Sequence, residues 1–249
     1  MDTVGPISRT VEDAAITLGA IAGHDPKDRY TWDVPVPDYR AALGGDLKGT
    51  RVGVVTDHLD SHLTDPEVKN GILKAASVMG ELGASVEEFS MPLAAESGTV
   101  SRIIMAMEPA FDHRRWVRER LQDYGHEAQM LLLLGSLIPA QAYYKAQKLR
   151  SMVRHHLMQA MEKYDVLVLP TYGKTAPLIK DDVVITSMEM AVSEQPYLVR
   201  RIINLSNVPG ISIPCGFDSG GLPIGLQIGG RAFDEETVLR VAHAYEQAT

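Results

Sequence analysis

Residues 51–56 read RVGVVT, a short apolar run between turn residues, which is typical of a buried β-strand. A helical pattern begins at Thr64 and ends at Gly83, because glycine commonly follows the last turn of a helix. Residues 84–89 then form a second candidate strand. The order strand, helix, strand predicts a βαβ unit, and therefore two parallel strands in an α/β fold.

Three further candidate strands follow a mostly helical stretch at residues 91–163. The first is DVLVL at residues 165–169, whose continuous apolar run predicts burial on both faces. The other two are GISIPC at 210–215 and PIGLQI at 223–228, which a turn signal at 218–221 joins as a strand pair. Parallel and paired strands together predict a mixed sheet covered by helices on both faces.

The helix boundaries carry clear capping signals. Thr10 is a good N-cap, and acidic residues in the following turn complement the helix dipole. This helix is expected to end at Gly23. Residues 24–50 are rich in Asp, Pro and Gly, which predicts an irregular surface excursion. A helix is expected near 196–206, and Asp234 is expected to cap a final helix.

The composition restricts the class of protein. The 249 residues are 45% hydrophobic with a net charge of −8, which argues against nucleic-acid binding because that calls for a basic face. The single cysteine excludes an internal disulfide framework and fits a reducing, cytoplasmic compartment. The longest apolar run, at 130–137, is far too short to span a membrane, so we expect a soluble protein with neither a nucleic-acid nor a membrane partner.

No reactive side chain of the sequence is favoured as a catalytic or metal-binding group. Ser219 lies in a polar turn, and His58 and His62 lie in a stretch that we interpret as loop, so neither histidine has a defined ligand geometry. Cys215 is interpreted as a small buried strand residue and Lys174 as a solvated loop charge. The sequence therefore predicts no catalytic residue, no metal site and no cofactor.

Four motifs occur in an order that resembles the amidase signature family. They are DTVGP with RTVEDAA in residues 2–15, Y-x-x-A-x-x-x-R in 143–150, YDVL with PT in 164–171, and N…PGISIPCGF…GLPIGLQ in 204–227. The resemblance covers essentially the whole chain. It implies an α/β/α sandwich and hydrolysis of carboxamide C–N bonds.

The family uses a Ser–Ser–Lys triad with a glycine-rich loop that stabilises the oxyanion. In family members the lysine and a Gly-Ser-Ser-Gly-Gly loop precede the DTVGP segment, so no triad residue can be assigned to this chain. We therefore expect residues 1–249 to be the C-terminal portion of a single, incomplete amidase domain that is inactive alone. One departure is Asn207, where the family often has glycine; asparagine tolerates the same left-handed backbone.

Five residues are assigned to a substrate pocket by the resemblance and by their position. They lie just after the candidate strand 165–169, or before and at the start of the candidate strand 210–215. In α/β sheets, ligands bind at the carboxyl ends of strands, which selects Thr171 and Tyr172. The closing motif adds Asn204, Pro209 and Gly210. Tyr172 has two interpretations, either contact with a small-molecule amide substrate or packing of its own loop.

Three alternatives remain. The A-subunit of a tRNA-dependent amidotransferase is the near one, although residues 101–125 lack its Asp-Gly-Val-Arg-Tyr-Gly pattern and favour a general amidase. A non-catalytic scaffold could pair through an open sheet edge, as a homodimer or with a separate N-terminal half. A nucleotide-binding domain on residues 51–56 is disfavoured, because Asp57 and Asp60 follow instead of a glycine-rich loop.

Overall fold

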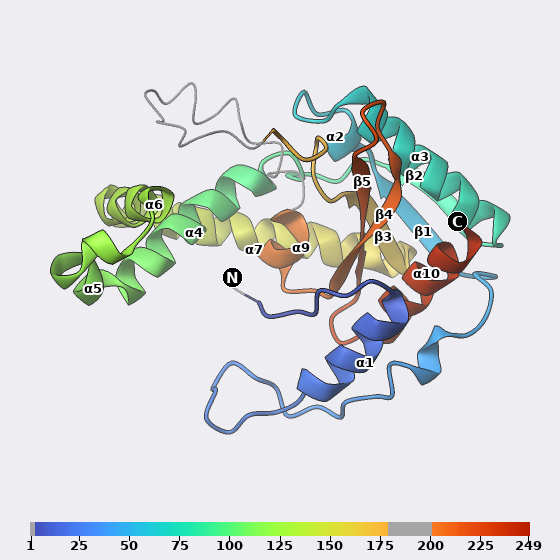
Figure 1. The fold of residues 1–249 in the computed structure, drawn as a ribbon, viewed down its shortest axis with the longest axis horizontal. Helices are drawn as coiled ribbons and strands as arrows, with labels where there is room; N and C mark the ends of the chain where they lie inside the picture. Colours follow the sequence, from blue (N-terminus) through green and yellow to red (C-terminus); the bar gives the residue numbers. More distant parts are fainter. Residues whose placement is uncertain (1–2, 179–200) are drawn as a thin grey trace.

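The computed structural model describes residues 3–178 and 201–249 of the chain (Figure 1). Its elements are, in order, α1 (Val11–Ile21), η1 (Ala41–Leu43), β1 (Arg51–Val55), α2 (Thr56–Leu59), α3 (Pro66–Glu81), β2 (Ser85–Phe89), α4 (Ser97–Asp112), α5 (Arg114–Glu119), η2 (Leu121–Asp123), α6 (His126–Leu137), α7 (Ala140–Lys163), β3 (Val166–Pro170), α9 (Arg201–Ser206), β4 (Gly210–Phe217), β5 (Pro223–Gly230) and α10 (Glu235–Ala248).

The described strands form one five-stranded sheet in the order β2-β1-β3-β5-β4. β1 pairs in parallel with β2 on one side and with β3 on the other. β5 pairs antiparallel with both β3 and β4. The predicted βαβ unit and the predicted strand pair are therefore both confirmed, and the sheet is mixed.

Helices cover both faces of the sheet, as β3 illustrates. Val166 and Val168 belong to a core that includes residues of α1, α3 and α10, whereas Leu167 and Leu169 belong to a second core with residues of α4, α7 and α9. Figure 1 shows α3 and α10 on one side of the strands and α9 and α4 on the other. Burying each aliphatic side chain contributes about 1.5–3 kcal/mol, which explains the unbroken apolar run of this strand.

The predicted caps are present at both ends of the chain. The Thr10 hydroxyl accepts a hydrogen bond from the Asp13 amide at 3.1 Å, and the Asp234 carboxylate accepts one from the Thr237 amide at 3.3 Å. Asn207 has a φ of 52°, the left-handed conformation expected from its place in the closing motif. Each cap satisfies an amide that a helix terminus would otherwise leave without a partner.

The stretch after β1 departs from the prediction of a loop. Residues Thr56–Leu59 form the short helix α2, and its His58 is buried with Nε2 3.1 Å from the Ala94 carbonyl oxygen. Because β1 leads directly into α2, His58 packs against the segment that follows β2. The interpretation of His58 as a loop residue was wrong.

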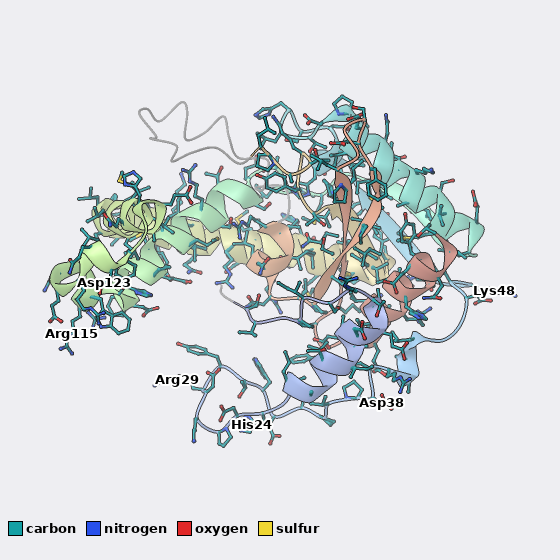
Figure 2. All side chains as sticks on the ribbon, viewed as in Figure 1. His24, Arg29, Asp38, Lys48, Arg115 and Asp123 are labelled. Atoms are coloured by element: carbon teal, nitrogen blue, oxygen red, sulfur yellow. The ribbon has the colours of Figure 1, made fainter. Side chains whose placement is uncertain are left out.

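The helical region after β2 extends away from the sheet. α4, α5 and α6 form an arm on the left of Figure 1, with Arg115 and Asp123 near its tip in Figure 2. The expected helix near 196–206 is α9 from Arg201, and residues 196–200 lie outside the described residues. Across the described ranges, no helix has both the length and the apolar character needed to cross a bilayer.

Candidate substrate pocket

A hollow of about 420 Å³ opens where β3 ends. Its described lining consists of Thr171, Tyr172, Lys174, Thr175, Ala176, Pro177, Pro223 and Gly225. The first six follow β3, and the last two belong to the start of β5. The pocket therefore lies at the carboxyl end of a buried strand, where ligands bind in α/β sheets.

Thr171 is fixed by contacts with both strands of the closing pair. Its amide donates to the Gly225 carbonyl oxygen at 2.9 Å, and its hydroxyl contacts the Ser212 hydroxyl at 2.5 Å. A Cβ on Gly225 would lie 2.9 Å from the Thr171 Cβ, so glycine is needed for this close approach. Sequence reasoning missed Ser212 and Gly225, because the register of β4 on β5 shifts between Pro214 and Phe217 and the 218–221 turn alone does not set it.

The loop that forms the pocket rim is tied down on both sides of Lys174. The Gly173 carbonyl oxygen accepts from the Asp65 amide at 2.7 Å, and the Thr175 hydroxyl donates to Asp218 Oδ2 at 2.6 Å. Asp218 Oδ1 accepts from two amides of its own turn. These hydrogen bonds, led by the one from Thr175, lower the pKa of Asp218, so its carboxylate is ionised and occupied.

The five residues expected to border the pocket divide into two groups. Thr171 and Tyr172 line the hollow, whereas the described lining does not include Asn204, Pro209 or Gly210. Gly210 pairs with Gly229, near the opposite end of β5 from Gly225.

The other two residues of this distant group also have structural contacts of their own. The Pro209 carbonyl oxygen accepts from the Gly230 amide at 3.0 Å, and Asn204 Nδ2 donates to the Thr3 hydroxyl at 3.4 Å. Their assignment to a substrate site stays a prediction, as does the choice between the two interpretations of Tyr172.

No described group near the hollow is a ready nucleophile or metal site. Burial raises the pKa of Cys215 to about 12, so this thiol is protonated at neutral pH, as expected for a buried strand residue. Ser219 lies in the predicted turn, where its amide donates to Glu67. Within the described residues, no three His, Cys, Asp or Glu side chains gather closely enough to hold a metal ion.

A family model described as Amidase matches residues 1–239. The chain belongs to the amidase family. It is 40% identical to the glutamyl-tRNA(Gln) amidotransferase A-subunit of Gloeobacter violaceus, over 100% of this chain and 55% of the relative. The corresponding A-subunit of Brevibacillus brevis is 37% identical, over 99% of the chain and 54% of the relative. The chain thus spans about half the length of the curated relatives it matches.

Solved amidase-family structures have the same fold. A bacterial aryl acylamidase of the amidase signature family has a TM-score of 0.84 at 23% identity, covering 98% of this chain and 52% of the other. The glutamyl-tRNA(Gln) amidotransferase A-subunit from Thermotoga maritima has a TM-score of 0.78 at 28% identity, covering 98% and 52%. The amidase motif at 164–171 corresponds to β3 and the first pocket residue, and the motif at 204–227 extends from α9 into β5.

Proposed function

We propose that this chain forms the pocket-bearing, C-terminal portion of an amidase-type hydrolase that cleaves carboxamide C–N bonds. The observation that carries the proposal is the hollow at the end of β3, in a chain whose amidase-family match covers residues 1–239. Thr171 and Tyr172 are the proposed substrate-contacting residues. Asn204, Pro209 and Gly210 are proposed to act at the far end of the same strand pair, where the closing motif begins.

The chemistry divides between binding and catalysis. The pocket offers hydroxyl oxygens that can accept from an amide N–H, those of Thr171 and Thr175; the proton of Thr175 is itself donated to Asp218. Amide cleavage also needs an activated nucleophile and donors for the oxyanion. The resemblance places the Ser–Ser–Lys triad before the DTVGP segment. We therefore expect these 249 residues to bind carboxamides without hydrolysing them.

A chimera tests this division directly. The segment of the Gloeobacter violaceus relative that matches this chain would be replaced by residues 1–249, and hydrolysis of simple carboxamides would be followed by ammonia release. We expect the chimera to hydrolyse amides and residues 1–249 alone to show no hydrolysis. A relative from which the matching segment is deleted is the negative control.

Two results would overturn the proposal. One is amide hydrolysis by residues 1–249 alone at a rate comparable with that of the chimera. The other is a chimera that unfolds cooperatively, like the intact relative, yet hydrolyses no carboxamide that the relative accepts.

The A-subunit of a tRNA-dependent amidotransferase is the second candidate function. It is favoured by the names of the curated relatives, which are 37–40% identical to this chain. The general amidase is favoured by residues 101–125, which lack the Asp-Gly-Val-Arg-Tyr-Gly pattern expected of the amidotransferase A-subunit. The two functions are distinguished by measuring hydrolysis by the chimera with and without glutamyl-tRNA(Gln) and the other components of the relative's amidotransferase. A general amidase needs none of these additions for hydrolysis.

The proposed partner surface is the outer edge of β4. β4 pairs with β5 alone in the described sheet, and Phe217 at its end is 71% exposed. Val4 and Ile7 on the N-terminal segment are also exposed. We propose that the N-terminal portion of an amidase domain docks here. Sedimentation of residues 1–249 with that portion should give a one-to-one complex, whereas a homodimer of the chain alone would favour the scaffold alternative.

A further inference from the structure

The charge of the pocket suggests which carboxamides it accepts. We infer that the hollow binds amides that also carry a carboxylate, and that the Lys174 ammonium group recognises this carboxylate. This inference rests on the proposed function, because it names the substrate class of the same pocket. It assigns to Lys174 a binding role, in place of the solvated loop charge that sequence reasoning favoured.

Lys174 is distinctive because of the other groups around the hollow. Among the described lining residues it is the sole one with a charged side chain, and the rest offer hydroxyls, backbone groups and apolar surface. No carboxylate of residues 3–178 or 201–249 forms an ion pair with it. An ammonium group has three donors and no acceptor, so an anionic ligand group is its complementary partner.

The backbone around Lys174 is held in place before any ligand binds. Gly173 on one side accepts from the Asp65 amide at 2.7 Å, and Thr175 on the other side donates to Asp218 at 2.6 Å. These contacts anchor the loop to α3 and to the β4–β5 turn. Because the loop is already ordered, binding does not have to offset the full entropy of fixing it.

The carboxylate of Asp218, which accepts from the residue after Lys174, is occupied by other donors. Asp218 accepts from the Thr175 hydroxyl and from the amides of Gly220 and Leu222, the latter two at 2.8 Å. Its carboxylate oxygens are thus occupied by the turn. The protein as a whole carries a net charge of −8, which disfavours anions elsewhere on its surface. A lysine at the pocket rim that forms no ion pair within the described part of the chain is therefore a selective site for an anionic group.

The test compares two probes that differ in one charge. Succinamate carries one carboxamide and one carboxylate, and succinamide carries two carboxamides. Binding to residues 1–249 would be followed by amide chemical shifts of Thr171, Tyr172 and Gly225 in NMR titrations. We expect succinamate to bind about fivefold more tightly at low salt, and this preference to shrink as salt screens the charge.

Variants identify the group responsible for the preference. Lys174→Met keeps the length of the side chain and removes its charge, so it should abolish the preference for succinamate while succinamide binds as before. Lys174→Arg should retain most of the preference. Lys48→Met is the matched control, because Lys48 is exposed at the right-hand edge of Figure 2, between η1 and β1, and should leave both affinities unchanged.

The outcomes separate the two proposals. Equal binding of both probes, or a preference that survives Lys174→Met, overturns the inference while the amide pocket stands. Absence of shifts at the pocket with either probe, up to their solubility limits, overturns the proposed pocket itself and the inference with it.

Discussion

At the amino end of β3, the carboxylate of Asp165 accepts from Arg51 at the start of β1 and from Arg231 just after β5, at 2.7 and 2.9 Å. At the carboxyl end of the same strand, Thr171 leads into a hollow whose one charged lining residue among those described is Lys174. The first end joins three neighbouring strands through paired charges. The second end leaves space where a ligand can lie, beside a lysine that forms no ion pair with any described carboxylate.

The difference shows how one strand can serve both stability and binding. The hydrogen bond from the Arg51 side chain, assisted by Arg231, holds the pKa of Asp165 well below its usual range. This carboxylate is therefore ionised at neutral pH and saturated with donors. At the pocket end, Lys174 has no ion-pair partner among residues 3–178 and 201–249, so substitutions at the two ends should have different consequences.

The largest effect is expected from breaking the paired end. Asp165→Ala leaves Arg51 and Arg231 without their shared carboxylate, and should lower the free energy of unfolding by about 3 kcal/mol in urea denaturation. Asp123→Ala is the control: its pair with Arg120 lies on the exposed helical arm (Figure 2) and should cost less than about 0.5 kcal/mol. Equal costs for the two substitutions would contradict the comparison.

The next effect concerns pH, because each end carries a titratable group with a lowered pKa. At the pocket end of the sheet, burial lowers the pKa of His58 from 6.5 to about 4. Between these values the unfolded chain binds the proton and the folded chain does not, so stability falls as pH drops from about 6.5 to 4, by about 2 kcal/mol. The stability that Asp165 contributes is lost in a separate, lower window, below the ordinary aspartate pKa of about 4.

Urea titrations at a series of pH values separate the two windows. His58→Gln retains a side-chain donor for the Ala94 carbonyl and should flatten the curve between pH 6.5 and 4. His24→Gln replaces an exposed histidine (Figure 2) and should leave the curve unchanged. A wild-type curve without a slope in this range would show that the folded His58 titrates at its ordinary pKa.

A smaller effect is expected from filling the space at the pocket end. Gly225→Ala places a Cβ 2.9 Å from the Thr171 Cβ and 3.0 Å from its hydroxyl, so Thr171 has to move. We expect a loss of about 1–2 kcal/mol in stability and loss of carboxamide binding in NMR titrations. Gly44→Ala is the matched control, since a Cβ there meets nothing within 4 Å. Unchanged amide binding by Gly225→Ala would place the ligand elsewhere.

Sequence reasoning identified the elements of the fold because their signals are local. The apolar run of β3, the caps at Thr10 and Asp234 and the turn at 218–221 each depend on neighbouring residues. It did not identify α2, because a four-residue helix has too few turns to show a hydrophobic period. The burial of His58 was missed for a different reason: its partner Ala94 lies 36 residues away in the sequence.

The candidate site was predictable only where it follows a strand. Thr171 and Tyr172 come directly after β3, so the rule for strand ends places them in the pocket. Ser212 contacts the first pocket residue, Thr171, through the register of β4 on β5 and on to β3, which no single motif specifies. Gly210 shares a motif with Ser212, but the same register places it near the opposite end of β5.

The smallest effect tests the contact between the Thr171 and Ser212 hydroxyls. Thr171→Val and Ser212→Ala each remove one hydroxyl of a pair, and a double-mutant cycle should give a coupling of about 1 kcal/mol in urea denaturation. Thr171 lines the pocket, so Thr171→Val should also weaken carboxamide binding. A coupling near zero would mean that each hydroxyl bonds to water instead, and that β4 contributes no ordered group to this end of β3.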